Sequence, residues 1–480
     1  MLWTHSQSTP PPDGMRIIPC PGVDLGAIDM ILTTGLIVDT RLDAGKLEDT
    51  LTTLIEQKFP RAGARIAFRN GAYEFHIPEK FGPHVPCVNF TVEDHPETYR
   101  ADASRPTLPM DLKVPSPSLP SLSKVPDAVY QYLRSSSCPQ SIEAVVESKK
   151  PMLYVHVVLF DDLTFIGVTS SHIGFDAVGT GTLLGAWSRL INGTGIDAIE
   201  GMPWDVQPFT CFNGPTRVTK QRGWFDLGIL SQMMFIAYFV WRLFRDPNEY
   251  GVFIRVPKSF LAQEKHKIME ELQAKGSGEW VGSSDVLTAW WYKTALGYRV
   301  NDRTSFHLHI PVNMREKPVF AGQSTLETPY TNNAAASIAI SPLPVKAFHK
   351  KSLTELALHV RRAILAYNAD LEGLRDDIRW RCANPFKTHF PCPPGGEYSF
   401  QTNWRMAGFG GLDFSGAAVG EQTKEVRVVF VFPMVTSGKH YPLRGSGCML
   451  MEDEEAVWLS QIRGEKDWDA IRHSASIAFV

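Results

Sequence analysis

The alternation of apolar and polar positions along the chain predicts a protein built from both helices and strands. Apolar residues recur at helical spacing from Leu47 to Ile55. The helix that they predict ends before Pro60, because proline lacks a backbone N–H and clashes with the preceding turn. Strands are expected at residues 65–68 and 72–77, since Asn70-Gly71 between them is typical of a tight hairpin turn.

The most regular pattern of the chain lies in its middle third. Residues 153–160 and 163–171 are rich in β-branched and aromatic side chains, which predicts a second hairpin. Residues 177–191 then follow with a helical pattern. The sequence between them, HIGFD, therefore places His172 at the exit of a strand and Asp176 at the entrance of a helix.

The length of 480 residues exceeds one ordinary core, so we expect two lobes. The stretch around residues 193–223 is rich in Gly, Pro and Trp and reads as a long linker. We therefore predict a first lobe at 1–200, a crossover linker at 201–225 and a second lobe at 226–480. Helices and strands alternate in both lobes, which predicts the α/β class with mixed α+β character. Further elements follow the same reasoning: a surface loop at 106–126, strands at 251–257, 305–312 and 426–433, and helices at 261–274, 284–298 and 352–370.

One apolar segment raises the question of a membrane. Residues 227–241 carry no charge, but they are fewer than the roughly 20 apolar residues that a spanning helix needs. We expect a helix that is buried in the protein or lines an apolar entrance, with contact to a membrane as the alternative. The first residues show no signal-peptide pattern.

Composition excludes several classes of function. The net charge is −3 with no dense basic block, which argues against a nucleic-acid partner. Seven cysteines are scattered without any CxxC spacing, so we expect neither a disulfide framework nor a metal site, and a reducing cytosol fits best. No GxSxG elbow and no phosphate-binding GxxxxGK[ST] loop occurs, so a covalent acyl-serine enzyme and a P-loop enzyme are not favoured.

The His172–Asp176 pair is the candidate chemistry, although an HxxxD match alone is a weak signal. His172 could be a satisfied histidine at a sheet edge, and Asp176 could simply cap a helix. A histidine held at the end of a buried strand is nevertheless well placed to act as a general base near neutral pH.

The order and spacing of several segments resemble the BAHD acyltransferases, a family of acyl-CoA-dependent enzymes, and in particular its fungal branch. The similarity covers most of the chain. Two departures stand out: the usual glycine after HxxxD is Ala177, and the DFGWG motif is here DFSGA. The segments that carry the resemblance are Leu25–Asp29, Phe59–Arg65, Pro151–Asp176, Ser283–Trp290, Ile310–Arg315, Tyr330–Asn333, Thr402–Trp404 and Asp413–Ala417.

The resemblance implies a chloramphenicol-acetyltransferase-like fold with two lobes of similar size and an active-site channel between them. His172 would take the proton of an acceptor hydroxyl, which attacks the acyl-CoA thioester directly, without a covalent acyl-enzyme. By the same resemblance, Trp404 with Thr402 nearby would stabilise the oxyanion. Asp176 would pair with Arg315 to hold the His172 loop. Asp413 would support the architecture from outside the channel.

Further expectations concern the ligands. Lys258 and Ser259, and likewise Ser283 and Ser284, stand at predicted helix starts, where phosphate groups of coenzyme A could bind. We expect acyl-CoA, with acetyl-CoA foremost, as cosubstrate, a small hydrophobic secondary metabolite as acceptor alcohol, no resident cofactor or metal, and a cytoplasmic monomer. Two alternatives stay open: a cyclase or condensing enzyme that uses the same base, and a non-catalytic binding protein.

Overall fold

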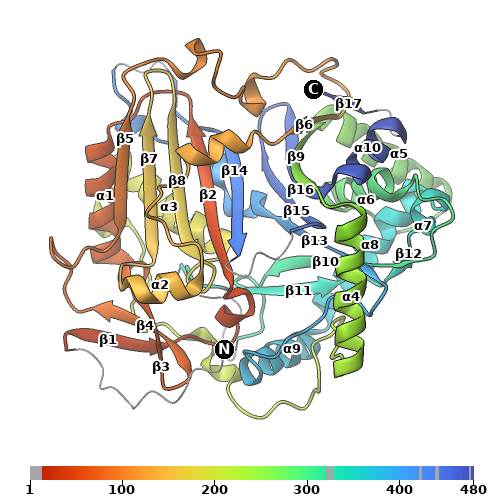
Figure 1. The fold of residues 1–480 in the computed structure, drawn as a ribbon, viewed down its shortest axis with the longest axis horizontal. Helices are drawn as coiled ribbons and strands as arrows, with labels where there is room; N and C mark the ends of the chain where they lie inside the picture. Colours follow the sequence, from red (N-terminus) through yellow and green to blue (C-terminus); the bar gives the residue numbers. More distant parts are fainter. Residues whose placement is uncertain (1–12, 321–325, 327–328, 421–423, 438–442, 475–476) are drawn as a thin grey trace.

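The computed structural model describes residues 13–320, 326, 329–420, 424–437, 443–474 and 477–480. Residues 1–12, on which the signal-peptide expectation rests, lie outside this range. The mixed α/β class predicted from the sequence is confirmed, because two large sheets are flanked by helices (Figure 1).

The first lobe is built on a sheet with the strand order β14-β2-β8-β7-β5. The predicted central hairpin is present, and both of its strands are buried along their whole length. Helices α1 and α3 pack against each other beside this sheet (Figure 1). The elements of this lobe are β2 (Met30–Val38), α1 (Ala44–Lys58), β5 (Asn89–Asp94), α2 (Ile142–Ser148), β7 (Leu153–Leu159), β8 (Thr164–Ser171), α3 (Ala177–Ile191) and β14 (Val428–Ser437).

A small sheet with the order β1-β4-β3 extends the first lobe. Its strands are β1 (Met15–Pro19), β3 (Arg65–Arg69) and β4 (Ala72–Pro78). The hairpin between β3 and β4 turns at Asn70 and Gly71, which have φ values of 52° and 79°. This left-handed conformation suits asparagine and glycine, so the predicted turn is confirmed.

The second lobe is built on a sheet with the order β11-β10-β13-β15-β16-β9-β6-β17, and β12 pairs with β10. Its strands are β6 (Ser121–Lys124), β9 (Glu249–Pro257), β10 (Ser305–Asn313), β11 (Ala335–Ala339), β12 (Leu343–Pro344), β13 (Glu397–Asn403), β15 (Ser446–Glu452), β16 (Ala456–Gly464) and β17 (Ala478–Phe479). Its helices are α4 (Ile229–Arg245), α5 (Lys258–Ala274), α6 (Ser283–Leu296), α7 (Lys346–Lys350), α8 (Leu353–Ala369), α9 (Leu371–Ala383) and α10 (Glu465–Ser474).

Each lobe contributes one strand to the sheet of the other lobe. The predicted division of the chain at 201–225 does not account for these two strands. Strand β6, from the first 200 residues, pairs with β9 of the second sheet, and β14, from the last third, pairs with β2 of the first. The expected surface loop at 106–126 is therefore partly wrong, because β6 is mostly buried. Strand β14 ends its sheet, yet Phe430 and Phe432 are buried because Phe253 of β9 packs edge-on against both rings, 5.1 Å between centroids.

Helix α4 contradicts the expectation of a buried helix at 227–241. It contains no buried residue, and the large apolar side chains along one side of it are exposed. The apolar run was predicted to be buried because apolar residues usually lie inside, but tertiary placement decides which side is covered. No helix in the described ranges combines the length and apolarity needed to cross a bilayer.

Candidate active site

A cavity of about 300 Å³ lies between the two lobes. Its wall brings together segments that are far apart in the chain, including the end of β8, the end of β13 and helix α9. The four predicted catalytic residues all line this cavity: His172, Asp176, Thr402 and Trp404. The described structure therefore offers one shared space in which two substrates could meet a histidine.

His172 is held at the end of β8 by its backbone and by its ring. Its N–H donates to the carbonyl oxygen of Met30 at 2.9 Å, which continues the pairing of β8 with β2. Its ring Nδ1 lies 3.1 Å from Oδ1 of Asn333, whose amide Nδ2 donates to the His172 carbonyl oxygen at 2.6 Å. Because this contact fixes Oδ1 as the acceptor, Nδ1 carries the proton and Nε2 keeps its lone pair. His172 thus has the tautomer of a general base.

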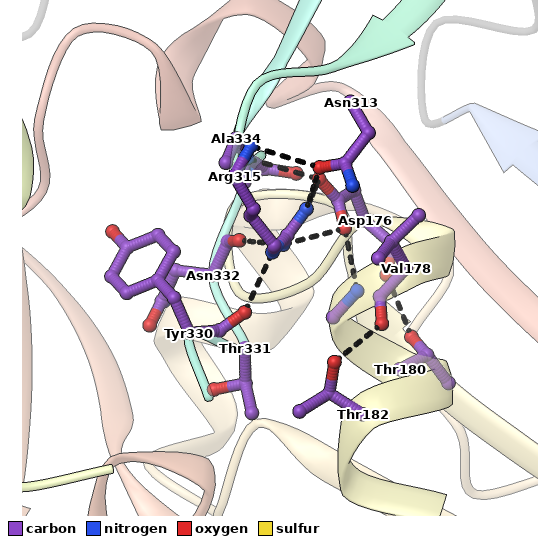
Figure 2. A network of polar contacts seen from close by, with 12 residues as sticks. Asp176, Val178, Thr180, Thr182, Asn313, Arg315, Tyr330, Thr331, Asn332 and Ala334 are labelled. Carbon is purple, nitrogen blue, oxygen red and sulfur yellow. Dashed lines mark hydrogen bonds and ion pairs between the residues drawn. The ribbon is translucent and has the colours of Figure 1, made fainter. Parts of the chain in front are cut away.

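Asp176 uses its carboxylate entirely to hold the loop that follows His172 (Figure 2). It caps α3 by accepting from Gly179 N–H at 2.7 Å and joins the second lobe by accepting from Ala334 N–H at 2.9 Å. Arg315 donates to both of its oxygens, at 2.9 and 3.1 Å. Both side chains are buried, so this bidentate pair acts as a rigid clamp between the lobes.

Two glycines of α3 permit the close contact between the lobes. A Cβ added at Gly179 would lie 1.8 Å from the carbonyl oxygen of Thr331, and one at Gly181 would lie 2.1 Å from that of Ala407. Glycine lowers the stability of a helix interior, but at these two positions it allows α3 to contact the backbone of the neighbouring segments. The start of α3 is thereby pressed against the segments that carry Asn333 and Trp404.

Trp404 and Thr402 face the cavity from the end of β13. The Thr402 hydroxyl donates to the Gly447 carbonyl oxygen at 3.3 Å, so its proton is already engaged. The indole of Trp404 is 7% exposed and packs edge-on against Phe409. Within the described ranges its Nε1–H makes no hydrogen bond, which leaves this donor available to a ligand in the cavity.

In sequence, the chain is similar to fungal acetyltransferases. No protein-family model matches the chain. It is 28% identical over 350 residues to acetyltransferase adrJ of Penicillium rubens, covering 70% of this chain and 68% of the relative. It is also 28% identical over 397 residues to O-acetyltransferase PaAT-2 of Phomopsis amygdali, covering 78% of this chain and 79% of the relative.

The second comparison is between this fold and solved structures. The crystal structure of F. sporotrichioides TRI101, complexed with coenzyme A and T-2, superposes with a TM-score of 0.67 at 14% identity, covering 95% of this chain and 97% of that chain. The sequence relatives and the fold support the fungal BAHD acyltransferase that the sequence predicts. The enzyme class predicted from the sequence, an acyltransferase, is confirmed.

The residues expected to contact coenzyme A are not part of this acyltransferase's cavity wall. Lys258 and Ser259 begin α5, while Ser283 and Ser284 begin α6. The cavity lining includes none of the four. Ser284 is instead linked to the Trp404 segment, because Arg405 donates to its hydroxyl at 2.6 Å. Their role toward coenzyme A stays a prediction.

Sequence reasoning missed two polar groups of the site. Asn333 lay in a segment quoted for the resemblance, but nothing local showed that it would meet His172, 161 residues away. Arg381 of α9 lines the cavity, and burial lowers its pKa. Its Nη2 donates to Oε1 of Gln221 at 3.5 Å, and no carboxylate of the described residues lies within 4.0 Å of its guanidinium. No sequence pattern marked this position.

Asp24 is a buried carboxyl group behind the site. It is 0% exposed, and neither oxygen has a well-aligned hydrogen-bond donor among the described residues. Burial raises its pKa well above the ordinary value, and the neighbours Asn333 and Arg61 oppose this only in part. The folded enzyme therefore holds a proton that the unfolded chain releases above about pH 4.

Asp24→Asn is expected to stabilise the enzyme at alkaline pH. A folded-state pKa above the unfolded value gives stability that is fully present below the unfolded pKa and is lost as the pH rises. The variant, which cannot ionise, should therefore melt above the wild type at pH 8 and approach it toward pH 4, as measured by thermal unfolding across this range. The exposed Asp49→Asn variant is the control. A difference that does not change with pH would contradict a protonated Asp24.

Asp413 supports a segment that lies against α3, outside the cavity lining. Its carboxylate accepts from Ser415 N–H at 2.8 Å, and within the described ranges no arginine pairs with it. Its backbone carbonyl accepts from Ser188 at 2.9 Å, and buried Phe414 packs edge-on against Trp187, 5.7 Å between centroids. The altered DFSGA motif thus remains anchored to α3 without the family's tryptophan.

Asp413→Ala is expected to reduce stability far more than chemistry. Losing the acceptor of the Ser415 N–H should cost about 1–3 kcal/mol in the free energy of unfolding. Turnover per folded molecule should fall only modestly, which denaturant unfolding and an active-site-normalised assay can separate. Asp413→Asn, which keeps an acceptor oxygen, is the matched control. A variant with a normal melting temperature but no turnover would place this segment in the catalytic apparatus.

Proposed function

We propose that this enzyme transfers an acyl group, acetyl foremost, from coenzyme A to a hydroxyl of a hydrophobic secondary metabolite. The observation that carries the proposal is the placement of His172, which lines a cavity formed by both lobes and whose Nε2 is hydrogen-bonded to none of the described residues. The names of the relatives, acetyltransferase and O-acetyltransferase, support the acetyl group and the oxygen acceptor. Coenzyme A and T-2 in the structurally similar TRI101 support the pairing of substrates.

The proposed reaction needs one base and one oxyanion donor. Nε2 of His172 takes the proton of the acceptor hydroxyl as its oxygen attacks the thioester carbonyl carbon. The C–O bond forms, and the Trp404 indole N–H donates to the oxyanion of the tetrahedral intermediate. The intermediate then collapses, the C–S bond breaks, and the departing thiolate takes the proton from the His172 imidazolium. Asn333 and the Asp176–Arg315 clamp hold His172 in place.

The character of the cavity supports a hydrophobic acceptor. Much of its wall is apolar, with Val23, Ala27, Trp224, Val312, Ala336 and Ile378 among the lining residues. We further propose that the enzyme works in the cytosol, which the free state of all seven cysteines supports, and that it is a monomer. We also propose that the helix starts near Lys258 and Ser283 form part of the binding site for coenzyme A.

The test supplies the enzyme with a panel of acyl-CoAs and a fungal metabolite extract. A thiol reagent measures released coenzyme A, and mass spectrometry identifies the products. We expect thiol release together with a product that has gained the acyl group, with acetyl-CoA used best. Consumption of a metabolite without thiol release would contradict acyl transfer and favour the cyclase alternative.

A further inference from the structure

Helix α4 presents a continuous apolar stripe to solvent. The stripe recurs at helical spacing, and its large side chains are 49–84% exposed. Its opposite side is fixed to the protein, where Phe235 packs against Phe390, 4.9 Å between centroids, and Arg242 lies 3.7 Å from Glu397. The stripe consists of Ile229, Leu230, Met233, Met234, Ile236, Val240, Trp241 and Phe244.

Two positively charged side chains, Arg245 and Lys466, lie at one end of this stripe. The Arg245 guanidinium lies over the Trp241 ring, 4.9 Å from its centroid, and Lys466 Nζ donates to the Arg245 carbonyl oxygen at 2.6 Å. Among the residues that the structure describes, neither cation has a carboxylate within 4.0 Å. Helix α4 itself contains no acidic residue. An apolar face with tryptophan and free cations at its border matches the interfacial region of a bilayer.

We propose that α4 docks this enzyme onto the surface of a membrane that contains anionic lipid. The helix has 17 residues, about 26 Å at 1.5 Å per residue, and one side is held by the protein, so it would lie in the plane of the interface. A second copy of the chain is the less suitable occupant, because its α4 offers no carboxylate to Arg245. Anionic headgroups would supply that partner.

The position of α4 connects the docking surface with the catalytic cavity. Gln221 and Trp224, a few residues before the helix, line the cavity, and Phe225 is bridged through its backbone to Phe390, which contacts α4. A docked enzyme would therefore hold the cavity close to the apolar phase. A hydrophobic acceptor could then enter the cavity from the bilayer. This consequence rests on the proposed function, whereas the docking of α4 does not depend on it.

Vesicle co-sedimentation tests the proposal. The full chain should bind vesicles of phosphatidylcholine with phosphatidylserine, and bind those of phosphatidylcholine alone more weakly. Leu230→Ser/Phe244→Ser should weaken binding by at least about tenfold, because two large apolar side chains lose their burial. Arg245→Gln/Lys466→Gln should weaken binding to the anionic vesicles by about fivefold per charge and remove most of the lipid preference. Leu119→Ser/Leu365→Ser, at two other exposed apolar sites outside the stripe, is the control and should bind like the wild type.

The outcomes separate docking from catalysis. A wild type that does not bind either vesicle, or a Leu230→Ser/Phe244→Ser variant that binds equally well, overturns the proposal and leaves acyl transfer standing. Light scattering that shows a dimer dissociated by the same variant would assign the stripe to a second copy and also overturn it. Vesicle binding by an enzyme that releases no coenzyme A would support docking and contradict only the proposed function.

Discussion

His172→Ala is expected to lower the turnover of acyl transfer by at least about 10², the usual scale for loss of a general base. The imidazole lines the cavity and can take the acceptor proton, since Asn333 engages Nδ1 and no residue that the structure describes is hydrogen-bonded to Nε2. The fold should persist, because the strand pairing of His172 uses its backbone N–H rather than its ring.

Steady-state release of coenzyme A thiol measures this effect, and thermal unfolding checks the fold. His266→Ala removes an exposed histidine from the surface of α5 and is the matched control, expected to keep full activity. Near-normal turnover of a well-folded His172→Ala variant would make the histidine structural and the proposed mechanism wrong.

Asp176→Ala is expected to destabilise the enzyme by about 3–5 kcal/mol, because it leaves the buried Arg315 guanidinium without its carboxylate. Activity should fall with it, since the loop after His172 loses its cap on α3 and its contact with Ala334. Denaturant unfolding measures the loss of stability, and the thiol assay measures the loss of turnover.

The double variant Asp176→Ala/Arg315→Met isolates the ion pair. If the two side chains stabilise each other, removing both should cost less than the sum of the single losses. Additive losses would mean that they act independently. Asp176→Asn gives the second control: a fully stable but inactive variant would show that the carboxylate takes part in the chemistry directly.

Local sequence patterns predicted the part of the site that lies close together in the chain. The run from β7 through β8 to α3 was predicted because β-branched residues precede His172 and a helical spacing of apolar residues follows it. Asp176 was placed at the helix entrance for the same reason, and it caps α3. These features depend on neighbours within a few residues along the chain. At that range the sequence pattern predicts the structure correctly.

Features that depend on distant contacts could not be predicted. Asn333 reaches His172 only after the second lobe folds against the first, and the exchanged strands β6 and β14 carry no signal of the sheet that they join. The apolar pattern of α4 is real, but a pattern does not show whether protein, solvent or lipid covers it. The two helix starts near Lys258 and Ser283 suited phosphate chemistry without lying in the cavity wall.

Direct transfer from coenzyme A to the acceptor is the central claim, and a single-turnover experiment tests it. The enzyme is mixed with acetyl-CoA before and after addition of the acceptor, while a thiol reagent follows coenzyme A and intact-protein mass spectrometry follows the chain. Our account predicts no thiol release and no acetylated protein until the acceptor is added, and then thiol and acetylated acceptor in equal amounts. A burst of thiol without acceptor, together with an acetyl group on the protein, would contradict it.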